Sequence, residues 1–425
     1  MASDLQNGHS GVRPGLHRTV EMTALLCAIL FLGGLASALT QPFLGVFAIE
    51  HIGLSLEAFG WAAGGTAAIS VVLAISIGKW TDQHGRHRQL YFVTQVAGAI
   101  GFGMCAMLAS PAAYMAASLV ALALFATTPS QALAWTKVAM SDNEAPSTHA
   151  AQGYVRAAYS LAWALGPALG GMLVASRSYT APFVAATAVC VLSAALCLAA
   201  RPVPPPAAHE RALASRRSRS GALHCLSMAL ALFSLCSNAA LLMVPIHIVK
   251  SLQHPPSLVG YLFAAAAALE VLLMVALSRS SFARRHALTV VSSGIASFAA
   301  YCLLIATASD LVGFLIAQVF NAVAVSAVMV MGLQALQAFL PGEAGRAAGI
   351  FGASLTGGAT LAGPFFSFLT SSATTAQFLQ AIAVLSTGAS LLAVLAAAWS
   401  SRQRSALPAR QRHQPGAKQM VRPGR

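Results

Sequence analysis

The stretch Gly78-Lys79-Trp80-Thr81-Asp82-Gln83-His84-Gly85-Arg86-His87-Arg88 separates two long apolar runs. It holds three fixed positive charges, one acid and two histidines, although only 8% of the chain is Asp, Glu, Lys or Arg. A basic cluster in so short a break is typical of a tight cytoplasmic turn between two membrane-spanning helices. The pattern Gly-x-x-x-Asp-x-x-Gly-Arg-x-Arg is also the most specific motif in the sequence.

The composition of the chain is that of a membrane protein. Its 425 residues are 57% hydrophobic with a mean hydropathy of +0.72, whereas a soluble domain carries about 25% charged residues. The apolar runs do not alternate as the strands of a transmembrane barrel do. Twelve runs, each long enough to cross the hydrocarbon core as a helix, lie near 22–47, 57–78, 90–109, 112–135, 154–176, 181–200, 222–249, 257–278, 287–307, 311–338, 347–370 and 375–399. The sequence therefore predicts an all-α polytopic membrane protein with twelve transmembrane helices.

Positive charge is concentrated on one side of the predicted bundle. Nearly all of the 25 Lys and Arg residues fall before the first run, in alternate connections or in the tail. Because positive loops stay in the cytoplasm during insertion, and because twelve is even, we expect both termini to be cytoplasmic.

A proline- and arginine-rich connection divides the chain into two pseudo-symmetric six-helix halves. Short matches at a period near 200, such as Phe59-Gly60-Trp61 with Val259-Gly260-Tyr261, indicate a duplication, which is a recurring transporter design. The basic tail is open to two interpretations, a solvated tail or a contact with anionic lipid. The predicted organisation is a cytoplasmic N-terminal tail (1–21), an N-terminal half (22–200), a cytoplasmic linker (201–221), a C-terminal half (222–399) and a basic cytoplasmic tail (400–425).

Several function classes are not indicated. The net charge of +14 lies in connections and tails and not on a soluble basic face, so nucleic acid is not an expected partner. None of the seven Cys has the spacing of a zinc or redox site, and no metal-ligand cluster is present. Without a nucleophilic triad or a phosphate-binding loop, we expect no enzymatic activity and no cofactor.

The turn at residues 78–88 has a mechanical interpretation. Gly78 would let two helices approach closely, and Gly85 would permit a tight reversal. Asp82 can accept hydrogen bonds from helix N-termini or a base, while Arg86 and Arg88 reach lipid phosphates or the facing half. The alternative is an ordinary basic loop.

Two motifs resemble those of the major facilitator superfamily. The turn is similar to its signature loop, except that Gln83 replaces a usual base. The segment Ala162-Trp163-Ala164-Leu165-Gly166-Pro167-Ala168-Leu169-Gly170-Gly171 resembles its antiporter motif, with Ala in place of the first Gly. Small residues allow close helix packing and proline removes a backbone hydrogen bond, so Gly166 and Pro167 join the predicted gating residues. A purely structural crossing is the alternative.

A further set of short segments runs through nearly the whole chain, namely Gln41-Pro42, Arg156, Ser160-Leu161-Ala162-Trp163, Gly166-Pro167, Ala268-Leu269-Glu270, Phe320-Asn321-Ala322, Leu340-Pro341-Gly342 and Ala344-Gly345. In these segments the chain resembles the bacterial sugar efflux transporter family. The resemblance implies the major facilitator fold, a bacterial inner (plasma) membrane location, and proton-linked export of sugars or related glycosides.

Glu270 is the only acid far inside a predicted span. An intramembrane carboxylate is costly and usually faces a cavity or partner, where it serves ions or protons. We therefore predict that Glu270 couples protons to transport. A structural Glu paired with a neighbouring amide is the alternative.

Sugar sites combine amides or carboxylates with aromatic platforms. Gln318 and Phe320 are further mid-span candidates, whereas Tyr114 and Trp135 are expected in interfacial belts. Any single amide can equally bridge two helices. The predicted substrate-binding residues are Gln41, Gln131, Tyr159, Trp163, Asn238, Glu270 and Asn321.

The sequence thus predicts a secondary active transporter, a monomer, that exports a sugar-like solute by proton antiport with alternating access around a central cavity. The partners are the solute, protons and the lipid bilayer. Three alternatives stay open: a multidrug/proton antiporter of the same superfamily, an uptake permease that would accumulate its substrate in the cell, and, from another class, a membrane-embedded enzyme or a membrane sensor without transport.

Overall fold

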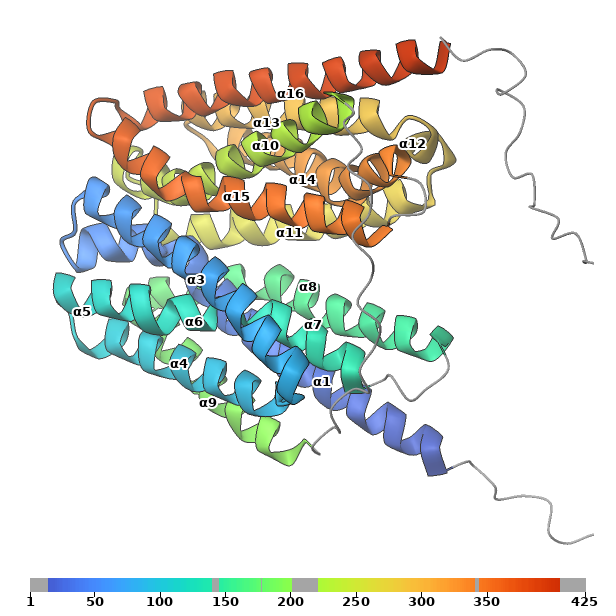
Figure 1. The fold of residues 1–425 in the computed structure, drawn as a ribbon. Coiled ribbons are helices and arrows are strands. Elements are labelled where there is room, and N and C mark those ends of the chain that lie inside the picture. The colour runs from blue at the N-terminus through green and yellow to red at the C-terminus, as the bar shows by residue number, and fades with distance from the viewer. Residues whose placement is uncertain (1–13, 140–144, 177, 201–220, 341–343, 406–425) are drawn as a thin grey trace, which may run out of the picture.

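The computed structural model describes residues 14–139, 145–176, 178–200, 221–340 and 344–405. All of the regular structure in these residues is helical, and Figure 1 shows it as two bundles. The first bundle comprises α1 (Pro14–Thr40), η1 (Gln41–Phe43), α2 (Leu44–Val46), η2 (Phe47–His51), α3 (Leu56–His84), α4 (His87–Met107), α5 (Pro111–Ala116), η3 (Ala117–Leu122), α6 (Ala123–Phe125), α7 (Thr128–Ala139), α8 (Ala145–Ser176) and α9 (Ala181–Ala199). The second comprises α10 (Gly221–Ile246), η4 (His247–Ser251), α11 (Pro256–Arg279), α12 (Ser281–Arg285), α13 (Ala287–Thr307), α14 (Leu311–Phe339), α15 (Ala344–Thr370) and α16 (Thr375–Ser405).

Eleven helical segments of the described residues are long and apolar enough to cross a membrane. The twelfth predicted run, near 347–370, forms α15, a helix of 27 residues. Its many Gly, Ser and Thr residues lower its mean hydropathy, which is why it is not among the eleven. It packs between α3 and α10 as part of the bundle. The described residues thus form twelve helical segments of bilayer length, as predicted.

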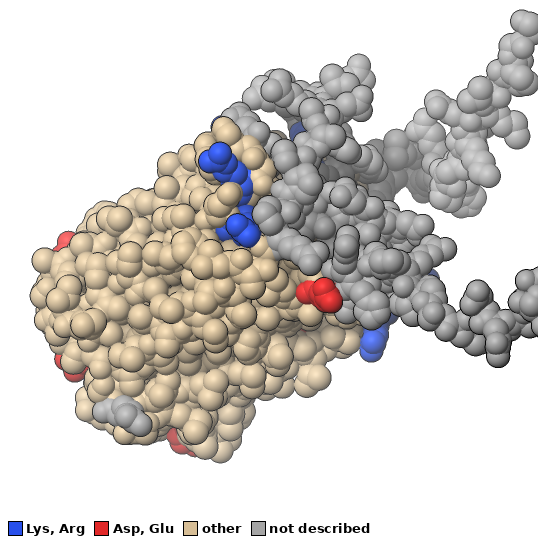
Figure 2. All heavy atoms as spheres, turned by 90° about the horizontal axis from the view of Figure 1, so that it is seen from below, with Lys and Arg blue, Asp and Glu red and all other residues tan. Residues whose placement is uncertain are grey.

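The surface and the core both fit a lipid environment. Large apolar side chains such as Leu272, Phe368 and Val384 are more than two-thirds exposed, which in water would be unfavourable. Figure 2 shows a face that is almost free of Lys, Arg, Asp and Glu. Inside the bundles, aromatic pairs such as Phe47 with Phe183, with ring centroids 4.1 Å apart, fill the core.

The two ends of the molecule differ. At one end, α1 begins and α16 ends (Figure 1), and we call it the terminal end. At the other end, which we call the closed end, lie η2 and η4 at residues 47–51 and 247–251. These five-residue π-helices stand 200 positions apart, which matches the period of the duplication.

Two seams join the bundles near the closed end, where α3 packs against α15 and α8 packs against α11. A Cβ atom added at Gly64 would collide with the Pro364 ring, and one added at Gly260 would collide with the Pro167 carbonyl. The Ser367 hydroxyl donates to the Glu57 carbonyl at 2.9 Å across the first seam. Glycine is needed in these helices because their backbones nearly touch.

The turn at residues 84–87 lies at the terminal end. Gly85 takes a left-handed conformation (φ 65°) that ends α3, and its N–H donates to the Thr81 carbonyl at 2.8 Å. Arg88 donates from Nη1 to the Ala200 carbonyl at 2.6 Å, at the C-terminus of α9 in its own bundle. The side chains of Asp82 and Gln83 lie outside the described residues.

The predicted close approach at Gly78 is wrong for this conformation. A Cβ atom added there would have no neighbour within 4 Å. The close contact of α3 occurs instead at Gly60 and Gly64, near the closed end, where the described residues of α3 and α15 form their seam.

Candidate functional site

A first cavity, the hydroxyl chamber, lies between the bundles next to the closed end. Its volume is about 260 Å³, and helices α1, α3 and α10 contribute most of its polar wall. Within the described part of the chain, none of its lining residues is Asp, Glu, Lys, Arg or His. The main polar side chains are Ser37, Thr40, Gln41, Thr66, Tyr114 and Asn238.

Local hydrogen bonds hold these side chains in place. Thr66 donates from Oγ1 to the carbonyl of Ala62 at 2.7 Å or of Ser118 at 3.0 Å. Asn238 donates from Nδ2 to the carbonyl of Ser234 at 2.8 Å. This bond uses the amide nitrogen and does not involve the amide oxygen. Hydroxyl and amide oxygens remain able to accept hydrogen bonds from a neutral polar solute.

A second cavity, the carboxylate chamber, has a volume of about 210 Å³ and holds Glu270. Glu270 extends from the middle of α11, and it is the only charged residue among the described residues of the wall. Its backbone carbonyl accepts a hydrogen bond from Ser326 of α14 at 3.2 Å. Amides and aromatic rings complete the wall, namely Trp163, Phe263, Phe298, Tyr301, Gln318 and Asn321.

No cation of the described residues pairs with Glu270. The only ion pair among them joins Lys250 to Glu50, with Nζ and Oε1 3.3 Å apart. Gln318 is nearly fully buried, and its Nε2 finds no hydrogen-bond partner within the described part of the chain. The chamber therefore contains a carboxylate and an amide donor that a proton or a polar ligand can engage.

A third cavity, of about 330 Å³, extends the hydroxyl chamber toward the terminal end. It shares Ala67, Ser70, Asn238 and Ala359 with that chamber, and Ser237 with the carboxylate chamber. The part of α15 that lines it, residues 355–360, begins earlier in the helix than the part that lines the hydroxyl chamber. The chain of cavities therefore runs from the closed end toward the terminal end.

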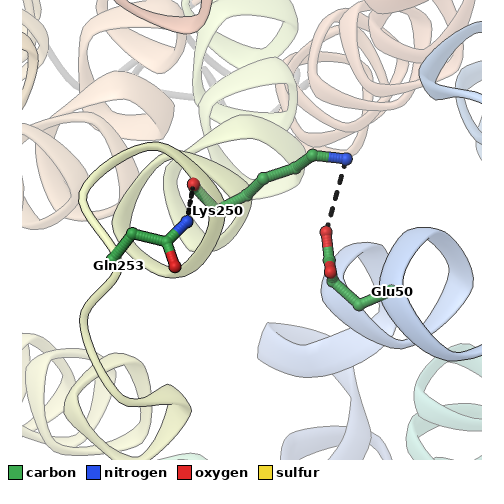
Figure 3. A network of polar contacts seen from close by, with 3 residues as sticks. All are labelled: Glu50, Lys250 and Gln253. Atoms are coloured by element: carbon green, nitrogen blue, oxygen red, sulfur yellow. Dashed lines mark hydrogen bonds and ion pairs between the residues drawn. The ribbon is translucent and has the colours of Figure 1, made fainter.

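Figure 3 shows the contact that bridges the two bundles at the closed end. Lys250 reaches from η4 to Glu50 on η2, while Gln253 donates from Nε2 to the Lys250 carbonyl at 2.6 Å. Gln253 itself has a positive φ of 55°. The Lys250 and Glu50 side chains are 52% and 38% exposed, so solvent screens their attraction.

The structure divides the predicted substrate residues between the two chambers. Gln41 and Asn238 line the hydroxyl chamber, while Trp163, Glu270 and Asn321 line the carboxylate chamber. The expected single central cavity is therefore, in this conformation, a set of adjoining chambers.

Two predicted substrate residues lie off the walls of these chambers. Gln131 in α7 is only 3% exposed, and the ring of Tyr159 packs against Gly34 of α1. Both contribute to packing inside the first bundle. The sequence could not distinguish them, because an amide or a tyrosine within an apolar run looks the same whichever way its helix is turned.

Several aromatic residues differ from their expected positions. Tyr114 and Trp135, predicted in interfacial belts, are buried, and Tyr114 lines the hydroxyl chamber. Phe320, predicted as an aromatic platform for the sugar, is exposed and does not line the chambers.

Tyr301 lines the carboxylate chamber but was not predicted, since nothing in its apolar run distinguishes it. Ser37 and Thr40 stand three residues apart, so they lie on the same face of α1. This spacing is the one sequence signal that indicates the polar wall of the hydroxyl chamber.

Two helical bundles with polar chambers between them are the architecture of a multi-pass membrane transporter. The chain belongs to the Major Facilitator Superfamily, whose family model matches residues 26–279 and 226–424. This confirms the superfamily resemblance of the turn and of the motif in α8. The family to which the chain belongs makes it a transporter and not an enzyme.

Curated relatives and solved structures agree with this assignment. Sugar efflux transporter A of Escherichia coli (strain K12) is 26% identical over 348 residues, which cover 80% of this chain and 87% of the relative. Sugar efflux transporter B of Salmonella typhimurium is 24% identical over 84% of this chain and 91% of its own. The crystal structure of a point mutant of the nucleoside transporter NupG superposes with a TM-score of 0.74 at 13% identity, covering 89% of this chain and 99% of that one.

Proposed function

We propose that this protein exports sugars or sugar-like glycosides across a bacterial inner membrane in exchange for protons. The observation that carries the proposal is a neutral chamber of hydroxyls and amides beside a chamber with one carboxylate, Glu270. The neutral wall suits a polyol, and the carboxylate suits a proton. The relatives named as sugar efflux transporters support the choice of solute.

The proposed cycle rests on rocking of the two bundles, which exposes the chambers to each side in turn. With both termini cytoplasmic, the closed end faces outward and this conformation loads solute from the cytoplasm. Glu270 releases its proton to cytoplasmic water before the solute binds. After the change of conformation the solute leaves, and a carboxylate oxygen of Glu270 takes a proton from outside water for the return.

The test of the coupling is Glu270→Gln in proteoliposomes. The amide has nearly the same size but cannot carry a proton, so we expect pH-driven transport to fall at least about a hundredfold. Counterflow of a labelled sugar, which needs no net proton movement, should persist.

The matched control for this test is Glu57→Gln, which removes an exposed acid of α3 outside the chambers. It should transport as the wild type does. Unchanged pH-driven transport by Glu270→Gln would refute the role of Glu270, and absence of counterflow for every sugar of a panel would refute the choice of solute.

A second candidate function, export of lipophilic cations, is favoured by one observation. Four aromatic residues, Trp163, Phe263, Phe298 and Tyr301, line the chamber that holds Glu270, and aromatic faces beside a carboxylate attract organic cations. Competition between tetraphenylphosphonium and sugars for binding to the wild type separates the two functions. Tight cation binding without sugar binding would favour drug export.

A further inference from the structure

The side chain of Leu241 stands between the two chambers. Among the residues that the structure describes, it alone lines both the hydroxyl chamber and the carboxylate chamber. Of these two chambers, Asn238 and Leu242 of the same helix line only the hydroxyl chamber, and Ser237 and Ala240 line only the carboxylate chamber. Ser237 and Asn238 also line the third cavity. Successive residues of a helix are turned by about 100°, so the two chambers meet neighbouring faces of α10, and Leu241 lies at the boundary between them.

The chemistry on the two sides of Leu241 is different. On one side the lining residues carry no formal charge, which suits a neutral solute. On the other side the Glu270 carboxylate lies among aromatic rings, a combination that binds organic cations. A solute that could reach both sides would be selected for positive charge and would compete with the proton for Glu270.

Leucine suits a partition because it is bulky and cannot form hydrogen bonds. Its isobutyl group gives neither a sugar hydroxyl nor water a partner at the boundary. Truncation to alanine would leave a void between the chambers unless the neighbours collapsed into it. Such a void would connect the hydroxyl chamber directly with the carboxylate.

We propose that Leu241 is a specificity-determining residue that closes the direct path from the hydroxyl chamber to Glu270 and so keeps organic cations in that chamber away from the carboxylate. The inference rests on the proposed sugar export and assigns the exclusion of cations to one side chain. Glu270 then binds protons and does not bind the solute. Solute binding influences Glu270 only through α10, the helix that lines both chambers.

The experiment is a gain of binding in Leu241→Ala, with tetraphenylphosphonium as the probe and purified full-length protein in detergent. We expect the affinity for the cation to rise at least about tenfold over the wild type. The double variant Leu241→Ala/Glu270→Gln should lose this gain, because the cation then has no carboxylate to approach. Leu241→Val, a smaller truncation, should give a smaller rise and serves if the alanine variant does not fold.

Leu242→Ala is the matched control, since Leu242 lines the hydroxyl chamber alone and the same three carbon atoms are removed. Its affinity for tetraphenylphosphonium should stay within about twofold of the wild type. Unchanged cation affinity in Leu241→Ala and Leu241→Val, or a gain that persists without Glu270, would overturn the partition. Sugar counterflow by the wild type is measured in parallel, and its absence would refute the proposed function instead.

Discussion

The closed end and the terminal end use glycine differently, and α3 carries both kinds. Near the closed end, Gly64 lies so close to Pro364 of α15 that no side chain fits. Towards the terminal end, Gly78 of α3 and Gly352 and Gly357 of α15 have no atom within 4 Å of an added Cβ. Glycine inside a helix costs about 0.5–1 kcal/mol relative to alanine, and at the terminal end no contact in this conformation offsets that cost.

This difference indicates a second conformation. If the bundles rock, the terminal-end glycines become the close contacts when the closed end separates, as alternating access requires. Glycines packed in one conformation and free in the other would let both seams form without a clash. The two ends of one helix can then be tested separately.

Gly64→Leu and Gly78→Leu should give the largest effects and should trap opposite conformations. Overpacking costs about 1–3 kcal/mol or more, so Gly64→Leu should depopulate the conformation described here by at least about tenfold. Gly78→Leu should leave this conformation intact and block the other. Both should abolish sugar counterflow, because exchange needs both conformations.

Distances between spin labels at positions 80 and 353, in a cysteine-free background, distinguish the two traps. The separation at the terminal end should shorten in Gly64→Leu and stay at its long value in Gly78→Leu. If Gly78→Leu transported as well as the wild type, the proposed role of the terminal-end glycines would be wrong.

Asp82→Asn should have an intermediate effect, on rate and not on affinity. Asp82 lies in the last turn of α3, where the helix dipole disfavours a negative charge, so a compensating role at the terminal end is expected. Loss of a compensating exposed charge pair, which contributes at most about 1 kcal/mol, should slow turnover by up to roughly fivefold with an unchanged KM for sugar. A raised KM at unchanged maximal rate would instead place Asp82 in solute binding.

The features that the sequence predicted are those that local patterns determine. Apolar runs specify the twelve helical segments, and Gly85 in its turn takes the left-handed conformation for which glycine was expected. Glu270 was recognisable because a lone acid in an apolar run needs a cavity or a partner. All three follow from neighbours in the chain.

The features that the sequence did not predict depend on how each helix is rotated about its axis and on which ends of the helices contact each other. Gln41 and Glu270 belong to different chambers because α10 lies between their walls, and no local pattern reports that arrangement. Gly64 and Gly78 are alike in sequence, yet only Gly64 lies where α15 approaches. Tyr114 is a chamber residue and not a belt residue because its helix turns it inward.

The smallest effect is expected at the Glu50–Lys250 pair, which holds the closed end by charge and not by packing. The two residues occupy matching places in η2 and η4, 200 positions apart, with opposite charges. A solvent-exposed pair contributes about 0.5 kcal/mol, so Lys250→Gln should shift the balance of conformations only about twofold. The charge-swapped variant Glu50→Lys/Lys250→Glu should restore the wild-type balance, measured by label distances across the closed end.

Raising the salt concentration is a second test, because ions screen exposed charges. Salt should reduce the difference between the wild type and Lys250→Gln and leave Gly64→Leu unaffected. A large, salt-independent effect of Lys250→Gln would mean that the pair carries the closure and that the seams do not. A weak ion pair is consistent with a transporter that alternates between two conformations. The pair must break in every cycle, so it slows turnover by as much as it stabilises the closed end.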